Sequence, residues 1–163
     1  PPFDWHMTNL RNYVKLSAAN APDLKLEGQT ITPLGQGSGM LGIPGDPTPP
    51  SRFVRALGYT LSAQRTQGGI ESVRLTEHIL NNFDIPIGWI KEGSGKETSK
   101  VPLEYTQWST IADLSNRKFY VKTYDDPTLR SIDLMSFDLN AKSLMTAAFK
   151  PAVVPQAWEF QKP

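Results

Sequence analysis

The 163-residue sequence contains no cysteine. Disulfide bonds, thiolate metal sites and a cysteine nucleophile are therefore excluded within these residues. Histidine is nearly absent as well, because only His6 and His78 occur, too few for a metal cluster in a chain without cysteine. We expect His6 to pack or cap at a first helix and His78 to lie on a partly exposed helical face. No metal and no cofactor is expected.

An excess of charge of one sign is also lacking, since 17 Lys and Arg face 16 Asp and Glu. This balance argues against a basic surface for nucleic acid. Apolar runs are only a few residues long, far below the roughly 20 residues that span a bilayer. Neither nucleic acid nor a membrane is therefore an expected partner, and the length suits one hydrophobic core.

A glycine pattern at residues 37–42 (GSGMLG) formally satisfies the dinucleotide motif GxGxxG. That motif needs a strand before it and a helix that starts within it, so that the helix N-terminus meets the pyrophosphate. Here Pro44 and Pro47 follow, and prolines at this density cannot continue a helix. We interpret the glycines of Gly35–Gly45 as mainly structural, with positive φ angles and close backbone approach.

Apolar spacing predicts helices in three places. The segment His6–Leu16 is expected to be helical, with Asp4 as its N-cap. Ser51 is expected to cap a second helix, and a third follows after Gly68-Gly69. The apolar positions of these two helices recur every four residues: Phe53, Leu57 and Leu61 in one, Leu75, Ile79 and Phe83 in the other.

Between the first two helices, Ala18–Pro50 is rich in Gly and Pro and predicts a long structured loop, of the kind that builds a site or a lid. Glu92–Lys100 is polar and predicts an exposed tip. Three β-branched and aromatic segments predict an antiparallel meander: Tyr105–Asp113, Lys118–Tyr124 and Leu129–Met135.

The end of the sequence predicts a short helix around Ala141–Leu144. After it, a proline-interrupted segment should pack across the rest through Val153, Val154, Trp158 and Phe160. Two helices beside an antiparallel sheet indicate the α+β class.

Three stretches, taken together and in order, carry a family resemblance: residues 2–13 (PFDWHMTNLRNY), 32–39 (TPLGQGSG) and 41–55 (LGIPGDPTPPSRFVR). They resemble the second half of the choloylglycine hydrolase family, which includes bile salt hydrolases and penicillin V acylases. Residues 105–125, from YTQW to Tyr124-Asp125, are similar to the family's hairpin, especially in its Gram-negative branch. The resemblance covers essentially the whole chain, and the Gly/Pro/Arg loop is its most specific part.

This resemblance implies an N-terminal nucleophile hydrolase fold, a four-layer αββα sandwich to which the chain would contribute two helices and the meander. In that family a Cys at the mature N-terminus attacks the substrate amide, and its own α-amino group, with a pKa of about 8, is the base. Residues 1–163 would then be the C-terminal portion of one domain. The Cys and the Asn of the oxyanion hole would lie in the N-terminal half, outside this chain.

One active-site position of the family falls clearly inside the chain, the Arg of its Pro-Ser-Arg-Phe stretch, here Arg52. The resemblance implies an electrostatic role, in which Arg52 holds the nucleophile or the substrate. Without the resemblance, an ion pair between Arg52 and Asp46 would be the preferred interpretation. Pro47 departs from the aromatic residue common there in relatives, which affects the expected shape of the acyl pocket.

The resemblance implies hydrolysis of a non-peptide carbon-nitrogen amide bond, as in penicillin V, conjugated bile acids or acyl-homoserine lactones. The expected partners are a small N-acyl amide substrate, the missing N-terminal half in cis or as a second chain, and further copies of the complete protein. The 163 residues alone should be inactive. The alternative is a non-catalytic fragment or a degenerate relative kept for binding or assembly. The expected location is the periplasm, with the cytoplasm as the alternative.

Overall fold

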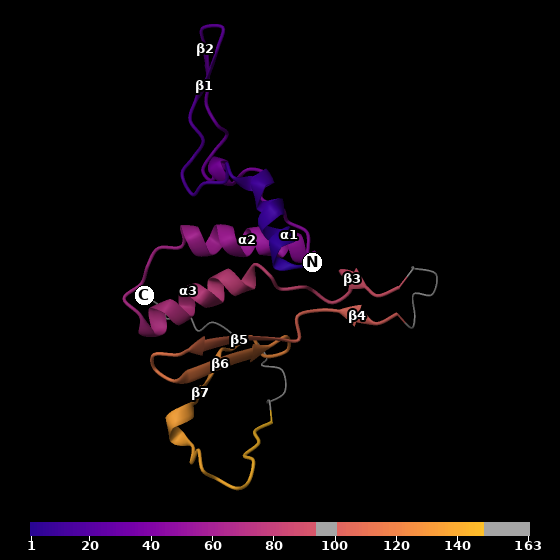
Figure 1. Ribbon diagram of the computed structural model, residues 1–163, viewed down its shortest axis with the longest axis vertical. Coiled ribbons are helices and arrows are strands. Elements are labelled where there is room, and N and C mark those ends of the chain that lie inside the picture. Colours follow the sequence, from indigo (N-terminus) through magenta and orange to yellow (C-terminus); the bar gives the residue numbers. More distant parts are fainter. Residues whose placement is uncertain (94–100, 149–163) are drawn as a thin grey trace, which may run out of the picture. The chain divides into compact units, whose positions relative to one another are not determined.

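The structure is a computed structural model that describes residues 1–93 and 101–148 (Figure 1). It divides into two compact units. The first holds residues 1–67 and 81–83, and the second holds residues 68–80 and the described residues from Asp84 onward. Helices and antiparallel strands both occur, as predicted for the α+β class. Among the described residues no helix is long and apolar enough to cross a membrane.

The first helix, α1 (Phe3–Leu10), is followed by the 3-10 helix η1 (Arg11–Tyr13). The predicted start at His6 and the predicted Asp4 cap are both wrong, because Asp4 lies in the first turn. Pro2 takes the N-cap position, and its carbonyl accepts hydrogen bonds from the backbone N–H groups of Trp5 and His6. A proline with extended backbone geometry therefore begins the helix without a polar cap.

The second helix, α2 (Pro49–Ser62), begins two residues before the predicted cap, so Ser51 lies in its first turn and Thr48 is the N-cap residue. Prolines fit the first helical positions because their missing N–H would have no partner there. The residue buried most deeply on α2 is Val54, at 2% exposure, rather than a member of the predicted stripe. Leu61, a member of that stripe, is 78% exposed.

Helices α1 and α2 pack through aromatic side chains. The Phe53 ring lies 6.0 Å from that of Phe3 in an edge-on contact and 4.7 Å from that of His6 in a stacked one. His6 therefore packs at the first helix, in line with the prediction. Farther along, Tyr59 contacts Phe83 edge-on at 6.3 Å, which ties the end of α2 to residues 81–83.

The predicted loop between these helices contains a hairpin that the sequence analysis missed, in which β1 (Leu24–Leu26) pairs antiparallel with β2 (Gln29–Ile31). Its turn places Glu27 and Gly28 at positive φ, 48° and 80°. A second 3-10 helix, η2 (Ser38–Met40), follows the hairpin. Figure 1 shows β1 and β2 as a narrow arm joined to the rest of the first unit by two stretches of chain.

Those two stretches, residues 17–21 and 36–40, form what we call the hairpin base. Four hydrogen bonds join them: Ser17 N to Gly39 O (2.9 Å), Gly37 N to Asn20 Oδ1 (2.8 Å), Ala21 N to Ser38 Oγ (2.9 Å) and Asn20 Nδ2 to Gln36 Oε1 (2.6 Å). The backbones meet most closely at Gly39, where a Cβ atom would overlap Ala19 O and lie 2.5 Å from Ser17 O. Residue 39 must therefore be glycine because there is no room for a Cβ atom, and not because of its φ angle.

In the second unit, α3 (Gly69–Asn81) confirms the predicted third helix, but the placement of Phe83 in its apolar stripe is wrong, because the helix ends before this residue. The predicted meander is also confirmed: β5 (Trp108–Asp113), β6 (Lys118–Thr123) and β7 (Arg130–Asp133) form an antiparallel sheet in that order. The short pair β3 (Ile90–Lys91) and β4 (Leu103–Glu104), and the 3-10 helix η3 (Leu134–Ser136), were not predicted.

The core of this unit includes Val73 of α3 and Ile111 and Val121 of the sheet, all buried. In the register of β5 and β6, Ile111 pairs with Tyr120, and Val121 pairs with Thr110. Directly paired residues share a face, so Ile111 and Val121 lie on opposite faces of the sheet. Both faces are therefore partly covered near its centre.

The predicted helix at Ala141–Leu144 is wrong, because these residues form bends and coil, with Leu144 96% exposed. A helix this short needs a packed apolar face, and none is formed here. His78 is exposed on α3, as expected. Residues 94–100 of the predicted tip, and the predicted tail contacts of residues 153–160, lie outside the described residues.

Candidate active site

Arg52 lies in the first turn of α2, where the Gly/Pro loop ends, and its side chain is exposed. Its backbone N–H donates to Thr48 O at 3.0 Å. Within residues 1–93 and 101–148 its guanidinium makes no hydrogen bond and no ion pair. The alternative interpretation, an ion pair with Asp46, is therefore wrong for this structure, and the charge of Arg52 is available to a ligand.

Asp46 instead binds the residues at the start of α2. Its carboxylate accepts hydrogen bonds from Ser51 Oγ at 2.5 Å and from both the hydroxyl and the backbone N–H of Thr48. The Ser51 hydroxyl, followed by Thr48, lowers the pKa of Asp46 from 3.8 to about 2. Hydrogen bonds to the charged form favour ionisation, so Asp46 stays ionised at neutral pH.

Arg55 is the second arginine of α2, and its environment differs from that of Arg52. Its side chain is only 7% exposed, and its Nη1 donates to the carbonyl oxygens of Pro44 and Asp46, both at 2.8 Å. Its guanidinium also lies over the Phe83 ring, 5.3 Å from the centroid. We refer to Asp46, Ser51 and Arg55, which together hold the end of the Gly/Pro loop, as the loop clamp.

Arg55 was not predicted as a site residue. A signal existed, because Ser51, Val54 and Arg55 follow the i, i+3, i+4 spacing that places residues on one helical face, and all three are buried. The same spacing leaves Arg52 off that face. In the described part of the chain, the start of α2 thus presents a cation without an ion-pair partner beside a helix N-terminus, where an anion is stabilised.

The Gly/Pro loop also borders a groove in the first unit. A cavity of about 680 Å³ is lined by residues from Asn12 to Pro22 and by Ser38, Gly39, Leu41 and Gly42. Gly37 and Gly42 have φ angles of 84° and 90°, which confirms that this run uses positive φ. The helix that begins within the GSGMLG pattern is η2, a 3-10 helix of three residues, and the next α-helix, α2, begins only at Pro49. The dinucleotide interpretation fails on geometry as well as on sequence.

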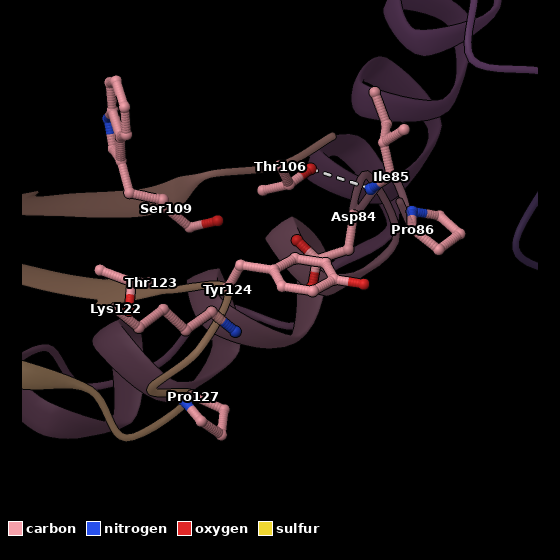
Figure 2. Close-up of a pocket in the computed structure, with 10 residues that line it drawn as sticks. Asp84, Ile85, Pro86, Thr106, Ser109, Lys122, Thr123, Tyr124 and Pro127 are labelled. Carbon is pink, nitrogen blue, oxygen red and sulfur yellow. Dashed lines mark hydrogen bonds between the residues drawn. The ribbon is translucent and has the colours of Figure 1, made fainter. Parts of the chain in front are cut away.

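A separate cavity of about 220 Å³ lies in the second unit (Figure 2). Its lining residues are Asp84, Ile85, Pro86, Thr106, Trp108, Ser109, Lys122, Thr123, Tyr124 and Pro127. Two hydrogen bonds between Ile85 and Thr106 fix one wall of the cavity. Figure 2 marks one of them, from Ile85 N to Thr106 Oγ1 at 2.8 Å. Lys122, whose side chain is 11% exposed, pairs with Glu77 of α3 at 3.4 Å.

This cavity was not predicted from the sequence, because its lining residues come from three separated segments whose side chains form no motif. The cation that lines the cavity, Lys122, is already paired with Glu77. The Thr106 hydroxyl accepts a hydrogen bond from Ile85 N and so holds the cavity wall. Neither Arg52 nor a member of the loop clamp lines it. Within the described part of the chain, no group of three or more His, Cys, Asp and Glu side chains could hold a metal ion.

Solved structures define the class of fold. A variant of the conjugated bile acid hydrolase from Clostridium perfringens superposes with a TM-score of 0.73 at 30% identity, over 96% of this chain and 46% of that one. Penicillin V acylase from Agrobacterium tumefaciens gives a TM-score of 0.60 at 17% identity, over 88% of this chain and 37% of that one, and shows the fold alone. These neighbours are N-terminal nucleophile hydrolases, so the predicted fold class is confirmed.

Sequence comparison gives the family. Residues 1–147 match the linear amide C-N hydrolases of the choloylglycine hydrolase family. A bile salt hydrolase/transferase from Clostridium perfringens is 34% identical over 148 residues, 90% of this chain and 43% of the relative. One from Bifidobacterium longum is 35% identical over 150 residues, with coverage of 91% and 45%. The chain belongs to the choloylglycine hydrolase family, as predicted, and spans less than half the length of these curated relatives.

Proposed function

We propose that the protein containing this chain hydrolyses a linear amide C–N bond, and that Arg52 is the residue this chain contributes to the reacting site. Family membership over residues 1–147 carries the proposal. The guanidinium of Arg52, at the start of α2, supports it, because it is exposed and has no partner among the residues that the structure describes. A cation in that position is free to act on a thiolate, a substrate carboxylate or a developing oxyanion.

The nucleophile must come from elsewhere, because the 163 residues contain no cysteine. In the proposed reaction an N-terminal Cys thiolate adds to the amide carbonyl, and its α-amino group takes the thiol proton. That proton then passes to the leaving amine, and water hydrolyses the resulting thioester to a carboxylic acid. Arg52 favours the thiolate form through its charge. Residues 1–163 are then the C-terminal portion of the domain.

A conjugated bile acid is the first candidate substrate. The relatives at 34–35% identity carry bile salt names, whereas the penicillin V acylase is only 17% identical. Penicillin V and an acyl-homoserine lactone are the next candidates. All three contain an N-acyl amide, so the same thiolate attack applies to each.

We also propose that the complete protein is a homo-oligomer located in the periplasm. The arm formed by β1 and β2 supports self-association, because it exposes three apolar side chains: Leu24 (57%), Leu26 (54%) and Ile31 (47%). Contiguous exposed apolar patches mark protein–protein contact surfaces when they are large.

The test uses the complete protein that contains this chain. Acid release from glycodeoxycholate, penicillin V and an acyl-homoserine lactone is followed by mass spectrometry for the wild type, Arg52→Ala and Arg52→Lys. Arg74→Ala, at an exposed position of α3, is the matched control. We expect Arg52→Ala to lower kcat/KM by roughly 100-fold, the scale of removing one stabilising charge or donor from such a site. Retained activity in Arg52→Ala, or no acid from any substrate, would contradict the proposal.

A further inference from the structure

The two arginines of α2 lie three positions apart but differ in exposure and in contacts. Arg52 is exposed and unpaired within the described residues, whereas Arg55 is 7% exposed and bonded to two carbonyl groups. A buried arginine is uncommon unless its donors are satisfied. The contacts of Arg55 are all made to the loop before α2 and to Phe83, so its charge is directed inward.

The loop needs these donors because of its composition. Residues 44–50 include four prolines, at positions 44, 47, 49 and 50. Proline has no backbone N–H, so this segment cannot close itself through main-chain hydrogen bonds alone. The carbonyl oxygens of Pro44 and Asp46, on either side of Gly45, accept instead from Arg55 Nη1. Asp46, in turn, accepts from Thr48 and Ser51.

These bonds form a continuous path to Arg52. Arg55 holds the backbone of Asp46, the Asp46 carboxylate holds Thr48, and Thr48 O accepts the backbone N–H of Arg52 at 3.0 Å. The position of the Arg52 backbone therefore depends on where the loop clamp holds the loop. A displacement of about 1 Å at a reacting group can cost roughly 100-fold in rate.

We propose that Arg55 is a positioning residue, which holds the loop clamp in place and so orients Arg52 toward the reacting groups. The inference rests on the proposed function of Arg52. Arg55 contacts neither substrate nor nucleophile in this arrangement, because its guanidinium is occupied by Pro44 O, Asp46 O and the Phe83 ring.

The experiment is a double-mutant cycle in the complete, active protein. The variants are Arg55→Met, which has a similar length but no donors, Arg55→Lys, Arg52→Ala and the two combinations. Arg74→Met serves as the control for loss of a helical arginine. We expect Arg55→Met to lower kcat/KM roughly 10- to 100-fold. Arg55→Lys should restore part of this loss, because an ammonium can donate to both carbonyl groups.

The cycle separates positioning from a general structural role. If Arg55 acts through Arg52, then Arg55→Met has little further effect on kcat/KM once Arg52 is alanine. Hydrogen exchange at the Arg52 amide should also become faster in Arg55→Met, since its bond to Thr48 is loosened. Equal losses in both backgrounds, or unchanged activity in Arg55→Met, would overturn the inference. If Arg55→Met does not fold, the same double-mutant cycle is measured with Arg55→Lys in its place.

If the proposed function of Arg52 is wrong, the kcat/KM values follow a different pattern. If Arg52→Ala alone leaves kcat/KM unchanged, the proposed role of Arg52 is wrong, and the positioning role of Arg55 fails with it. If Arg52→Ala lowers kcat/KM but the effect of Arg55→Met is independent of it, only the inference about Arg55 fails.

Discussion

Replacing Gly39 by alanine tests the hairpin base directly. Gly39 has an ordinary φ, so alanine is not excluded by its backbone conformation. The obstacle is space, because the new Cβ would overlap the carbonyl oxygen of Ala19 and lie 2.5 Å from that of Ser17. Both atoms belong to backbone, which cannot rotate away as a flexible side chain can. The two strands of the hairpin base must therefore separate.

The cost follows from two contributions. Overpacking of a close contact costs about 1–3 kcal/mol. The bond from Ser17 N to Gly39 O, 2.9 Å long, is strained or lost, which adds about 1 kcal/mol. We expect Gly39→Ala to lower the free energy of unfolding by about 2–4 kcal/mol, provided that the hairpin base unfolds with the rest of the protein.

Urea denaturation of the complete protein measures this change. At an m-value of roughly 2 kcal/mol per molar, the midpoint should fall by about 1–2 M. Gly45→Ala is the matched control, because Gly45 also has an ordinary φ and a Cβ there would meet nothing within 4 Å. That control should stay within about 0.5 kcal/mol of the wild type. Similar midpoints for Gly39→Ala and Gly45→Ala would refute the steric reasoning.

Two further predictions concern stability. Val54→Ala removes two buried methyl groups and should lower the free energy of unfolding by about 2 kcal/mol or somewhat more. Leu61→Ala, on the same helix but 78% exposed, should change this free energy by less than about 0.5 kcal/mol. Equal shifts of the urea midpoint in the two variants would contradict this assignment of the core. The folded-state pKa of Asp46, about 2, lies below its ordinary value of 3.8, so its stabilising contribution is present above about pH 4 and is lost as the pH falls toward 2. Asp46→Asn should therefore lose less stability than the wild type between pH 5 and pH 2, as seen in urea midpoints; parallel curves would show that Asp46 is not linked to folding.

Much of the fold could be predicted from periodicity. Helix α3 and the meander of β5, β6 and β7 follow the predicted segments, because long apolar spacing and β-branched runs are strong local signals. The boundaries of α1 and α2 were less accurate, since neither N-cap residue, Pro2 or Thr48, makes a side-chain capping hydrogen bond. Local rules for polar caps do not describe such starts.

The missed features depend on contacts between distant residues. Strands β1 and β2 have three residues each, too few for a clear alternation, and their turn requires Glu27 at positive φ, which sequence rules disfavour. The spacing of Ser51, Val54 and Arg55 indicates a shared helical face, but the contacts of Arg55 could not be predicted, because its acceptors are backbone carbonyls that only the folded loop brings within reach. Arg52 was identified through the family resemblance alone, and its role in catalysis stays a prediction.

The hydrogen bonds of the hairpin base hold the arm in place, and they do not depend on how long the arm is. The bonds that join residues 17–21 to 36–40 close the chain before β1 begins and after β2 ends. Residues added or removed near Glu27 and Gly28 therefore leave every one of those bonds in place. Because the entropy of closing a loop grows only logarithmically, doubling its length costs about 0.6 kcal/mol. The reach of this arm is a property that can vary among proteins without disturbing the Gly/Pro loop that precedes Arg52.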